Sequence, residues 1–443
     1  MFDTIVAIAS GNINQAISII RISGPEALKI ISRIFTGKIG ENKTISFGYI
    51  VDENNDKIDE VLVSIFRGKN NFVGEDTIEI NAHGGIIITN IILQLVVING
   101  ARLASPGEFS RRAFLNGKID LIKAEAINDL IHSKTKIQTQ IAIQKFNNKS
   151  SELISDLIKI IEKIIGICEV NIDYPEYDDI EQMDQLKIIK IIKEIKNKIE
   201  SIIKISEENQ IFMEPQSVVI VGQPNVGKSE LMNLILNEEK SIVTDIAGTT
   251  RDVVEGEIIF NNIILKFKDT AGIRNTNDVI EKIGIEKSFQ QIENSSIILH
   301  VMDVNKTIDE IDMQIEEKSK GKLYFKIYNK SDLLPKNKLK NWEKKIIISA
   351  KNKDITKLEQ EFNKHFNNIL LDHSFSFNSR QIILLKKGQK LLSEALKAID
   401  DGMGFDVVIV DIVETWENIK SIVGDINKED LLDSIFSNFC LGK

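Results

Sequence analysis

The chain has 443 residues, of which 42% are hydrophobic and 27% charged, an ordinary globular composition that disfavours disorder, a collagen-like repeat and a disulfide-stapled mini-protein. Its formal charge of −9 excludes an overall basic field, so any nucleic acid must be met through a local patch or a partner protein. At about 150 residues per domain, the length predicts about three domains.

The two cysteines, Cys168 and Cys440, lie far apart and form no C-x-x-C pair, so neither a zinc site nor a disulfide framework is indicated. The N-terminus lacks the basic start of a signal peptide. The most apolar run, residues 86–98, is interrupted by polar residues and is too short to span a bilayer. We therefore expect a cytoplasmic protein without stable membrane insertion.

Residues 1–117 predict an α+β domain. Short alternating or β-branched runs, such as AISIIRIS, TISFGYIV, EVLVSIF and DTIEINAH, are separated by Gly, Asn and Asp clusters and predict strands. One apolar run of helical length, residues 85–99, interrupts them.

Residues 118–212 predict the first part of a helical domain. Apolar residues recur at helical spacing through LIKAEAINDLIHS and ELISDLIKIIEKIIGI, and a third helix is expected from about 182 to 206. The tail, residues 373–443, is helical again and is too short to bury a large core by itself. We expect the two helical parts to pack together as one discontinuous domain.

Residues 213–372 predict a doubly wound α/β domain inserted into that helical domain. An apolar strand, SVVIV, leads into a Gly-rich turn and a helix, and a hairpin is expected to turn at Asn261-Asn262. The later strands SIILHVMD, KLYFKIYN and KKIIISA alternate with helical patterns.

A phosphate-binding motif opens this domain. Residues 222–229, GQPNVGKS, match G-x-x-x-x-G-K-[ST] between a strand and a helix. The glycines let backbone N–H groups surround the phosphates, Lys228 reaches the terminal phosphates, and Ser229 offers its hydroxyl to Mg²⁺. The alternative is a Gly-rich turn that binds no ligand.

Three later segments follow in the order of a Ras-like P-loop GTPase. Residues 269–272, DTAG, provide an Asp near the metal and an amide near the γ-phosphate. Residues 329–332, NKSD, end a strand, and the Asp332 carboxylate can accept both guanine N1–H and N2–H₂. Residues 349–351, SAK, follow the next strand at the level of the same base. The nucleotide is therefore expected to be GTP.

Two features of the sequence concern GTP hydrolysis: a loop between these motifs, and the absence of the glutamine that positions water in Ras-like GTPases. Residues 245–252, DIAGTTRD, can cap the γ-phosphate and Mg²⁺ when GTP is bound, with Thr250 as the metal-binding hydroxyl. Ile273 stands where Ras-like GTPases carry the water-positioning Gln, and Ile cannot orient water. Glu281, acting through a water, and a monovalent cation held by Asn225 are candidate replacements. From spacing alone, a solvated helix-face carboxylate is the favoured interpretation of Glu281.

The predicted GTP-binding residues are Asn225, Val226, Gly227, Lys228, Ser229, Glu230, Thr244, Asp245, Ile246, Ala247, Gly248, Thr249, Thr250, Asp269, Thr270, Ala271, Gly272, Asn329, Lys330, Asp332, Ser349, Ala350 and Lys351.

The chain resembles one family over almost its whole length: the tRNA-modifying GTPases called MnmE or TrmE. The GTPase motifs alone are shared with many ribosome-assembly GTPases. The segments DTIVAIAS, FVGEDTIEINAHGG and RLASPGEFSRRAFLNGKIDLIKAEAINDLI and the terminal C-L-G-K are far more specific to this family.

The resemblance implies particular roles for residues. The first domain would be a folate-binding fold that pairs with its copy in a homodimer and binds a tetrahydrofolate derivative carrying a one-carbon unit. The family's catalytic acid falls on Glu281, and its terminal cysteine, to which we assign no role, on Cys440. The folate contacts fall on Arg21, Glu79, Lys118 and Lys443, the K⁺ shell on Asn225, Thr244, Ile246 and Thr249, and the Mg²⁺ ligands on Ser229 and Thr250.

The resemblance also implies a partner and a product. Family members form a heterotetramer with the flavoprotein MnmG, also called GidA, which carries FAD and uses NADH. Together they install a carboxymethylaminomethyl or aminomethyl-type group at C5 of the wobble uridine, position 34, of certain tRNAs. The chain is thus expected to be a K⁺-stimulated GTP hydrolase whose movement drives tRNA modification.

One segment departs from the family, and two other functions remain open. Where the family has a Pro-Pro-Gly-Arg-Gly-Gly turn, this chain reads GNINQA at residues 11–16, which puts folate affinity or the geometry of this turn in question. One alternative is a ribosome-assembly-type GTPase switch that acts by binding. The other is a folate-dependent one-carbon enzyme regulated by its GTPase domain.

Overall fold

The computed structural model describes residues 3–173, 185–237, 257–267, 289–335, 342–369, 375–424, 429–437, 439–440 and 442. The chain divides into two compact units. One comprises Met1–His132, Lys145–Lys196 and Leu384–Lys443, and the other Ser133–Gln144 and Asn197–Ile383.

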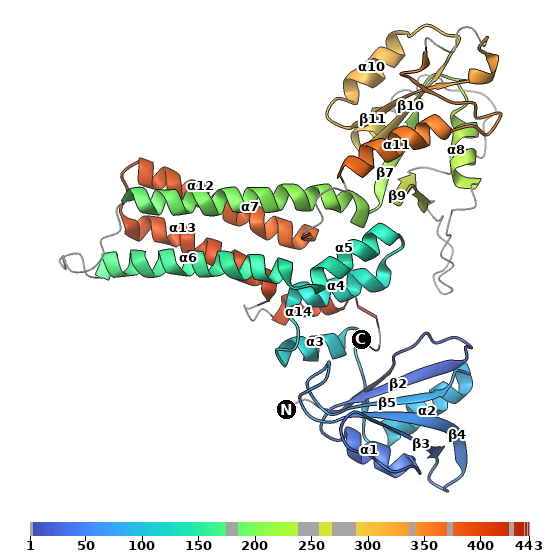
Figure 1. The fold of residues 1–443 in the computed structure, drawn as a ribbon, viewed down its shortest axis with the longest axis vertical. Helices are drawn as coiled ribbons and strands as arrows, with labels where there is room; N and C mark the ends of the chain where they lie inside the picture. Colours follow the sequence, from blue (N-terminus) through green and yellow to red (C-terminus); the bar gives the residue numbers. More distant parts are fainter. Residues whose placement is uncertain are drawn as a thin grey trace. The chain divides into compact units, whose positions relative to one another are not determined.

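The first unit contains a six-stranded sheet near the N-terminus, covered on one face by two helices (Figure 1). The strand order is β3-β4-β5-β2-β1-β6, and apart from the parallel pair β1 and β6 its neighbours are antiparallel. Buried residues alternate along β2, β4 and β5 and pack against the helices, as a half-buried sheet requires. The elements are β1 (Ile5–Ile8), β2 (Ile17–Ser23), α1 (Ala27–Ile34), β3 (Thr44–Val51), β4 (Lys57–Phe66), β5 (Thr77–His83), α2 (Ile86–Ile98) and β6 (Arg102–Leu103).

Two helices of this unit were not predicted. The run 85–99 is a helix, as expected, but α1 and α3 (Glu108–Leu115) are helical as well. In α1 the buried residues Ala27, Ile30, Ile31 and Ile34 have helical spacing. The helix is only eight residues long and rich in β-branched Ile, so the segment also reads as a strand.

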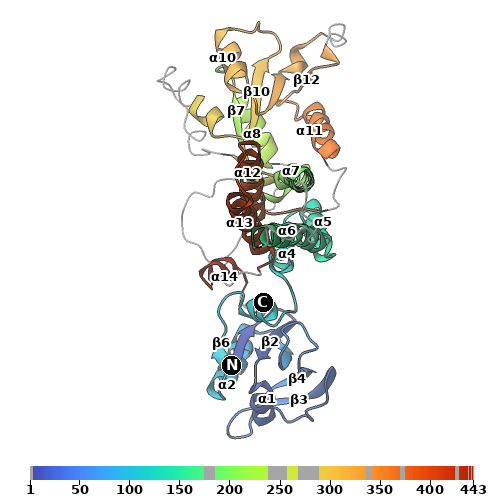
Figure 2. The ribbon, with the colours of Figure 1, turned by 90° about the vertical axis from the view of Figure 1, so that its left-hand side faces the viewer.

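Helices from the two predicted helical parts of the chain pack together in the first unit. Helices α6 (Lys149–Asp173) and α13 (Phe405–Val423) lie side by side in both views (Figure 1, Figure 2). Trp416 Nε1 donates a hydrogen bond to Glu162 Oε1 at 3.1 Å. Segments of the two predicted helical parts therefore pack together, although residues 133–144 and 197–212 belong to the second unit. Further helices of these parts are α4 (Leu121–His132) and α14 (Glu429–Phe436), and α12 (Ser379–Asp400) begins in the second unit.

The second unit is built on a six-stranded sheet of order β12-β11-β10-β7-β9-β8. All neighbours are parallel except β8 and β9, which form the predicted hairpin, with Asn261 and Asn262 at φ of 49° and 67° in its turn. The elements are β7 (Gln216–Val221), α8 (Lys228–Asn237), β8 (Glu257–Phe260), β9 (Ile263–Phe267), β10 (Ile297–Asp303), α10 (Glu310–Lys318), β11 (Leu323–Asn329), β12 (Ile346–Ile347) and α11 (Thr356–Ile369).

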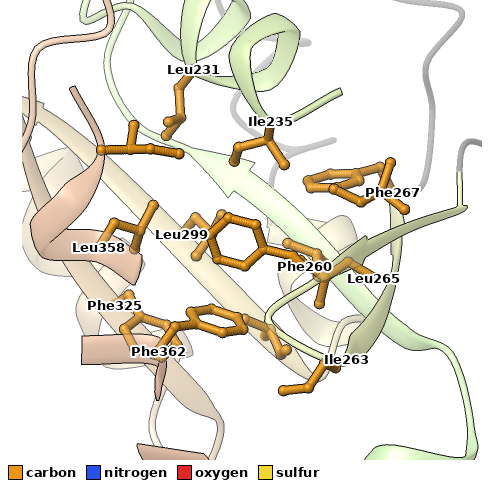
Figure 3. Packing of buried hydrophobic residues seen from close by; sticks show 14 of the residues in the cluster. Leu231, Ile235, Phe260, Ile263, Leu265, Phe267, Leu299, Phe325, Leu358 and Phe362 are labelled. Carbon is orange, nitrogen blue, oxygen red and sulfur yellow. The ribbon is translucent and has the colours of Figure 1, made fainter. Parts of the chain in front are cut away.

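Aliphatic residues and several phenylalanines pack together on one face of this sheet (Figure 3). The rings of Phe325 and Phe362 stack with centroids 4.8 Å apart, and Phe260 meets Phe362 edge-on at 5.1 Å. Leu231 and Ile235 of α8 belong to the same cluster, so packing fixes the helix that follows the Gly-rich turn.

Helices α5 (Lys136–Phe146) and α7 (Gln185–Met213) contact each other in the second unit. Helix α7 runs seven residues beyond the expected end. In the second unit, the buried Gln138 of α5 donates through Nε2 to the Phe212 carbonyl of α7 at 2.9 Å. Across the described part of the chain, no helix combines the length and apolarity needed to cross a membrane.

Candidate functional site

The Gly-rich turn lies between β7 and α8, and its glycines are sterically required. Gly222 has φ of 145°, and a Cβ there would lie 2.1 Å from the Val301 carbonyl oxygen of β10. Gly227 has φ of 94°, and its Cβ would lie 2.2 Å from Asn329 Nδ2. A side chain at either position would push the turn away from the neighbouring strands.

The ammonium of Lys228 is held inside this turn. Its Nζ donates to the carbonyl oxygens of Gly222 at 2.8 Å and Gln223 at 2.7 Å. Burial lowers the pKa of Lys228 below its ordinary value. Neutral carbonyls are weaker partners for an ammonium than phosphate oxygens, so the turn presents a cation suited to an anionic ligand.

The N-terminus of α8 adds further groups that suit a metal-bound nucleotide. Ser229 lies exposed in its first turn, beside backbone N–H groups at the positive end of the helix dipole. Its hydroxyl oxygen is a ligand type that Mg²⁺ accepts. Asn225 is exposed in a left-handed conformation, with φ of 61°.

The buried amide of Asn329 joins three motifs. This side chain, 1% exposed at the end of β11, donates through Nδ2 to the Val226 carbonyl at 2.9 Å and accepts through Oδ1 from the Ala350 N–H at 3.0 Å. The GQPNVGKS, NKSD and SAK segments therefore converge at the carboxyl ends of parallel strands, where doubly wound sheets bind ligands.

The neighbouring carboxylates have fixed orientations. Ser349 Oγ donates to Asp332 Oδ1 at 2.7 Å, and Asp332 itself is exposed. Lys330, with φ of 66°, pairs with Asp303 at 2.8 Å. Burial alone would raise the pKa of Asp303, but the Lys330 ammonium and the Asn305 N–H outweigh it and hold the pKa below its usual value.

Part of the predicted site lies outside the described residues. This applies to the loop at 244–250, the DTAG segment, the candidate acid and the terminal lysine. The residues concerned are Thr244, Asp245, Ile246, Ala247, Gly248, Thr249, Thr250, Asp269, Thr270, Ala271, Gly272, Glu281 and Lys443.

A second candidate site is a pocket of about 340 Å³ beside the N-terminal sheet. Arg21 of β2 lies directly opposite Glu79 of β5, and Arg21 Nε donates to Glu79 Oε1 at 2.9 Å. Arg21 Nη1 also donates to the Gly442 carbonyl at 2.9 Å, which brings this residue near the C-terminus to the pair. The lining residues are Arg21, Lys43, Phe66, Asn70, Asn71, Phe72, Val73, Thr77 and Glu79.

Sequence reasoning identified two of these lining residues and missed the others. Lys43 and Phe66 come from a loop and a strand end outside any motif, whereas Phe72 opens the segment FVGEDTIEINAHGG, which also contains Glu79. Lys118, the other described candidate, lies beside Gly74, where an added Cβ would be 3.0 Å from Lys118 Cε.

The atypical turn at residues 11–16 has a structural role. Asn14 Oδ1 accepts a hydrogen bond from the Ile86 N–H at 3.0 Å, which satisfies a free donor at the start of α2. Gln15 N–H donates to the Gly84 carbonyl at 2.9 Å, and a Cβ at Gly84 would lie 2.3 Å from the Gln15 oxygen. The polar residues thus anchor this turn to the loop before α2.

Comparisons with known proteins cover both halves of the chain. A family model described as "GTP-binding protein TrmE N-terminus" matches residues 4–118, and one described as "MnmE helical domain" matches residues 121–440. Three curated relatives carry the name tRNA modification GTPase MnmE: those of Mycoplasmopsis pulmonis, Mycoplasma mobile and Bacillus subtilis are 54%, 50% and 40% identical to this chain, each over 100% of both chains.

Proposed function

This chain belongs to the MnmE family of tRNA modification GTPases, and from that premise we propose that it couples K⁺-stimulated hydrolysis of GTP to chemistry at C5 of a wobble uridine. The group installed is of the carboxymethylaminomethyl or aminomethyl type, its one-carbon unit comes from a folate, and a flavoprotein partner carrying FAD shares the reaction. The predicted boundaries, residues 1–117, 118–212 with 373–443, and 213–372, are part of the proposal.

The observation that carries the proposal is the pair of hydrogen bonds made by Asn329. They tie the phosphate-binding turn to the segment after β12, and Asp332 lies three residues beyond Asn329. One nucleotide can therefore be held by its phosphates and its base. A carboxylate at the base level favours guanine because guanine offers two adjacent donors and adenine does not.

The described residues fit the metal ions of the proposal. Ser229 would hold Mg²⁺, which neutralises the phosphates, and Asn225 would hold K⁺ beside them, where a cation supplies the charge that an arginine finger supplies elsewhere. Thr250, for Mg²⁺, and Thr244, Ile246 and Thr249, for K⁺, complete these shells in the proposal. Glu281 is proposed to orient the attacking water.

The N-terminal pocket fits a flat, hydrogen-bonding folate ring. Phe66 and Phe72 supply apolar walls, and the Glu79 carboxylate can accept from ring N–H groups. Lys118 and Lys443 are proposed to meet the anionic part of the folate. The site is proposed to be completed in a homodimer through this domain, and in a heterotetramer with the flavoprotein, which supplies much of the tRNA contact for this acidic chain.

The wobble-uridine chemistry is tested in cells with and without the protein. Mass spectrometry of tRNA nucleosides should show the C5 modification lost on deletion and restored by the wild-type gene but not by a Lys228→Ala gene. Unaltered wobble uridines in the deletion strain would refute the tRNA role. Co-sedimentation with ribosomal subunits in that case would favour the ribosome-assembly alternative.

The hydrolysis mechanism is tested with purified protein. Exchange of K⁺ for Na⁺ should slow GTP turnover by at least about tenfold, because the smaller ion fits the proposed shell poorly. Glu281→Ala should keep GTP binding and lose most turnover. Unchanged turnover of this variant in saturating K⁺ would remove Glu281 from the mechanism.

A further inference from the structure

A polar cluster adjoins the phosphate-binding turn and has no part in the function proposed so far. It consists of the buried His300 and Asp312 and the half-buried Gln223 and Tyr324. His300 of β10 is 0% exposed, and Asp312, in the first turn of α10, is 2% exposed. A carboxylate so deeply buried is costly unless its oxygens accept hydrogen bonds, so each of its partners matters.

The hydrogen bonds of Asp312 involve both of its oxygens. Oδ2 accepts from Gln223 Nε2 at 2.8 Å and from the Asp309 N–H at 3.3 Å, while Oδ1 lies 3.0 Å from His300 Nε2. On the other side of the imidazole, His300 Nδ1 lies 2.7 Å from the Tyr324 hydroxyl. The cluster therefore runs from β11 through β10 and α10 to the phosphate-binding turn.

The protonation states fix the direction of these hydrogen bonds. Burial lowers the pKa of His300, although Asp312 opposes this effect, and burial raises the pKa of Tyr324. A neutral imidazole that accepts the Tyr324 proton at Nδ1 carries its own proton on Nε2 and donates it to Asp312. The nearby charges of Lys326 and Glu316 pair with each other at 2.7 Å.

Gln223 connects this cluster to the phosphate-binding lysine. Its side-chain amide is held by Asp312, and its backbone carbonyl accepts from Lys228 Nζ at 2.7 Å. The preceding residue, Gly222, packs against the Val301 carbonyl of β10. The start of the turn is thus fixed on one side by β10 and on the other by α10.

We propose that Asp312 is a positioning residue for the phosphate-binding turn: it holds the Gln223 amide, and His300 and Tyr324 hold the Asp312 carboxylate in the orientation that this requires. The inference rests on the proposed function only in taking a guanine nucleotide as the ligand of the turn.

A donor–acceptor swap tests the proposal on the full-length protein, with affinity for a fluorescent GDP analogue as the readout. Gln223→Glu places two carboxylates together and is expected to weaken binding by about tenfold or more. In the double variant with Asp312→Asn, the amide and the carboxylate exchange places with the same chain lengths. The asparagine oxygen still accepts from His300, and the swap loses only the long hydrogen bond from the Asp309 N–H, at 3.3 Å. Affinity should therefore return to within about threefold of wild type.

A matched control separates geometry from charge. Glu310 lies exposed in the same turn of α10, so Glu310→Gln makes the same charge change as Asp312→Asn without touching Gln223. Combined with Gln223→Glu, it should leave the binding defect in place. Equal rescue by Glu310→Gln would reduce the effect to net charge and overturn the proposal.

Four further outcomes would contradict the proposal or the function on which it rests. Wild-type GDP affinity of the Gln223→Glu variant, or a folded double variant that stays as weak as the single one, would overturn the positioning role. If Gln223→Glu does not fold, Gln223→Met removes the amide without adding charge and should still weaken binding severalfold, while unchanged affinity would refute the proposal. A wild-type protein that binds no guanine nucleotide would instead refute the proposed function.

Discussion

The nucleotide site and the N-terminal pocket differ in how the chain assembles them. The nucleotide site uses short continuous motifs that follow parallel strands, so the topology of the sheet brings them together. The pocket uses single residues from distant parts of the chain: Arg21 is separated by 58 residues from Glu79 and by 421 from Gly442. Local motifs in the sequence predict the first arrangement, whereas only the family resemblance pointed to residues of the second.

The cationic side chains of the two sites also have different hydrogen-bond partners. Lys228 is held by neutral carbonyl oxygens and is suited to exchange them for a ligand, whereas the Arg21 guanidinium is already paired with a carboxylate and a backbone oxygen. Loss of the first cation should therefore remove ligand binding, and loss of the second should remove structure as well. Substitutions in both sites test this contrast.

The largest effect is expected from Lys228→Ala. Loss of its charge-assisted hydrogen bonds to phosphate should weaken GDP and GTP binding by at least about 100-fold. The unfolding temperature should change little, because the variant also removes a desolvated ammonium. Titration with a fluorescent nucleotide measures the affinity, with the exposed Lys320→Ala as control. Affinity within tenfold of wild type would contradict this account.

A change of base preference is expected from Asp332→Asn. The amide offers a donor where guanine also has donors, so GTP binding should weaken by about tenfold or more, while xanthosine triphosphate, which has an acceptor there, should bind better. Ser349→Ala, which frees the Asp332 carboxylate and removes the acceptor of the Asn352 N–H, should have a smaller effect. Competition between the two nucleotides measures the switch. A variant that still prefers guanine would place the base elsewhere.

A structural loss is expected from Arg21→Met. The variant leaves Glu79 and the Gly442 carbonyl without this donor, in a site where both side chains of the pair are less than one quarter exposed. The free energy of unfolding should fall by about 1–3 kcal/mol in urea denaturation, and the C-terminus should become more sensitive to carboxypeptidase. Arg33→Met, which removes one exposed hydrogen bond, serves as control. Equal stability of the two variants would break the contrast between the sites.

The smallest effect concerns Asp3, which pairs with Arg102 and Arg112. A hydrogen bond from Arg102, with help from Arg112, holds the pKa of Asp3 at about 2, below its usual 3.8. The stabilisation is therefore present above pH 3.8 and is lost as the pH falls towards 2. Because the Asp3 side chain is 56% exposed, solvent screening keeps this contribution below about 1 kcal/mol.

Denaturation of the wild type and of Asp3→Asn measures this last effect. At pH 7 the variant should be slightly less stable, and the difference should shrink as the pH is lowered from 4 towards 2. A difference that grows on acidification would show that the carboxylate is not stabilised in the folded state.

The sequence by itself determined the elements whose signals are local. The strand before the phosphate-binding turn, the start of α8 and the Asn261-Asn262 hairpin were all predictable, because left-handed turn residues, glycines and apolar periodicity act over a few residues. Helix α1 was missed, since eight β-branched-rich residues satisfy two patterns at once.

Only the tertiary structure decided which side chains meet. It placed the Asn329 amide between two loops, the C-terminus against Arg21, and Gln223 against Asp312. Each of these contacts depends on strand order and helix packing, which arise from many weak long-range interactions and leave no local pattern in the chain.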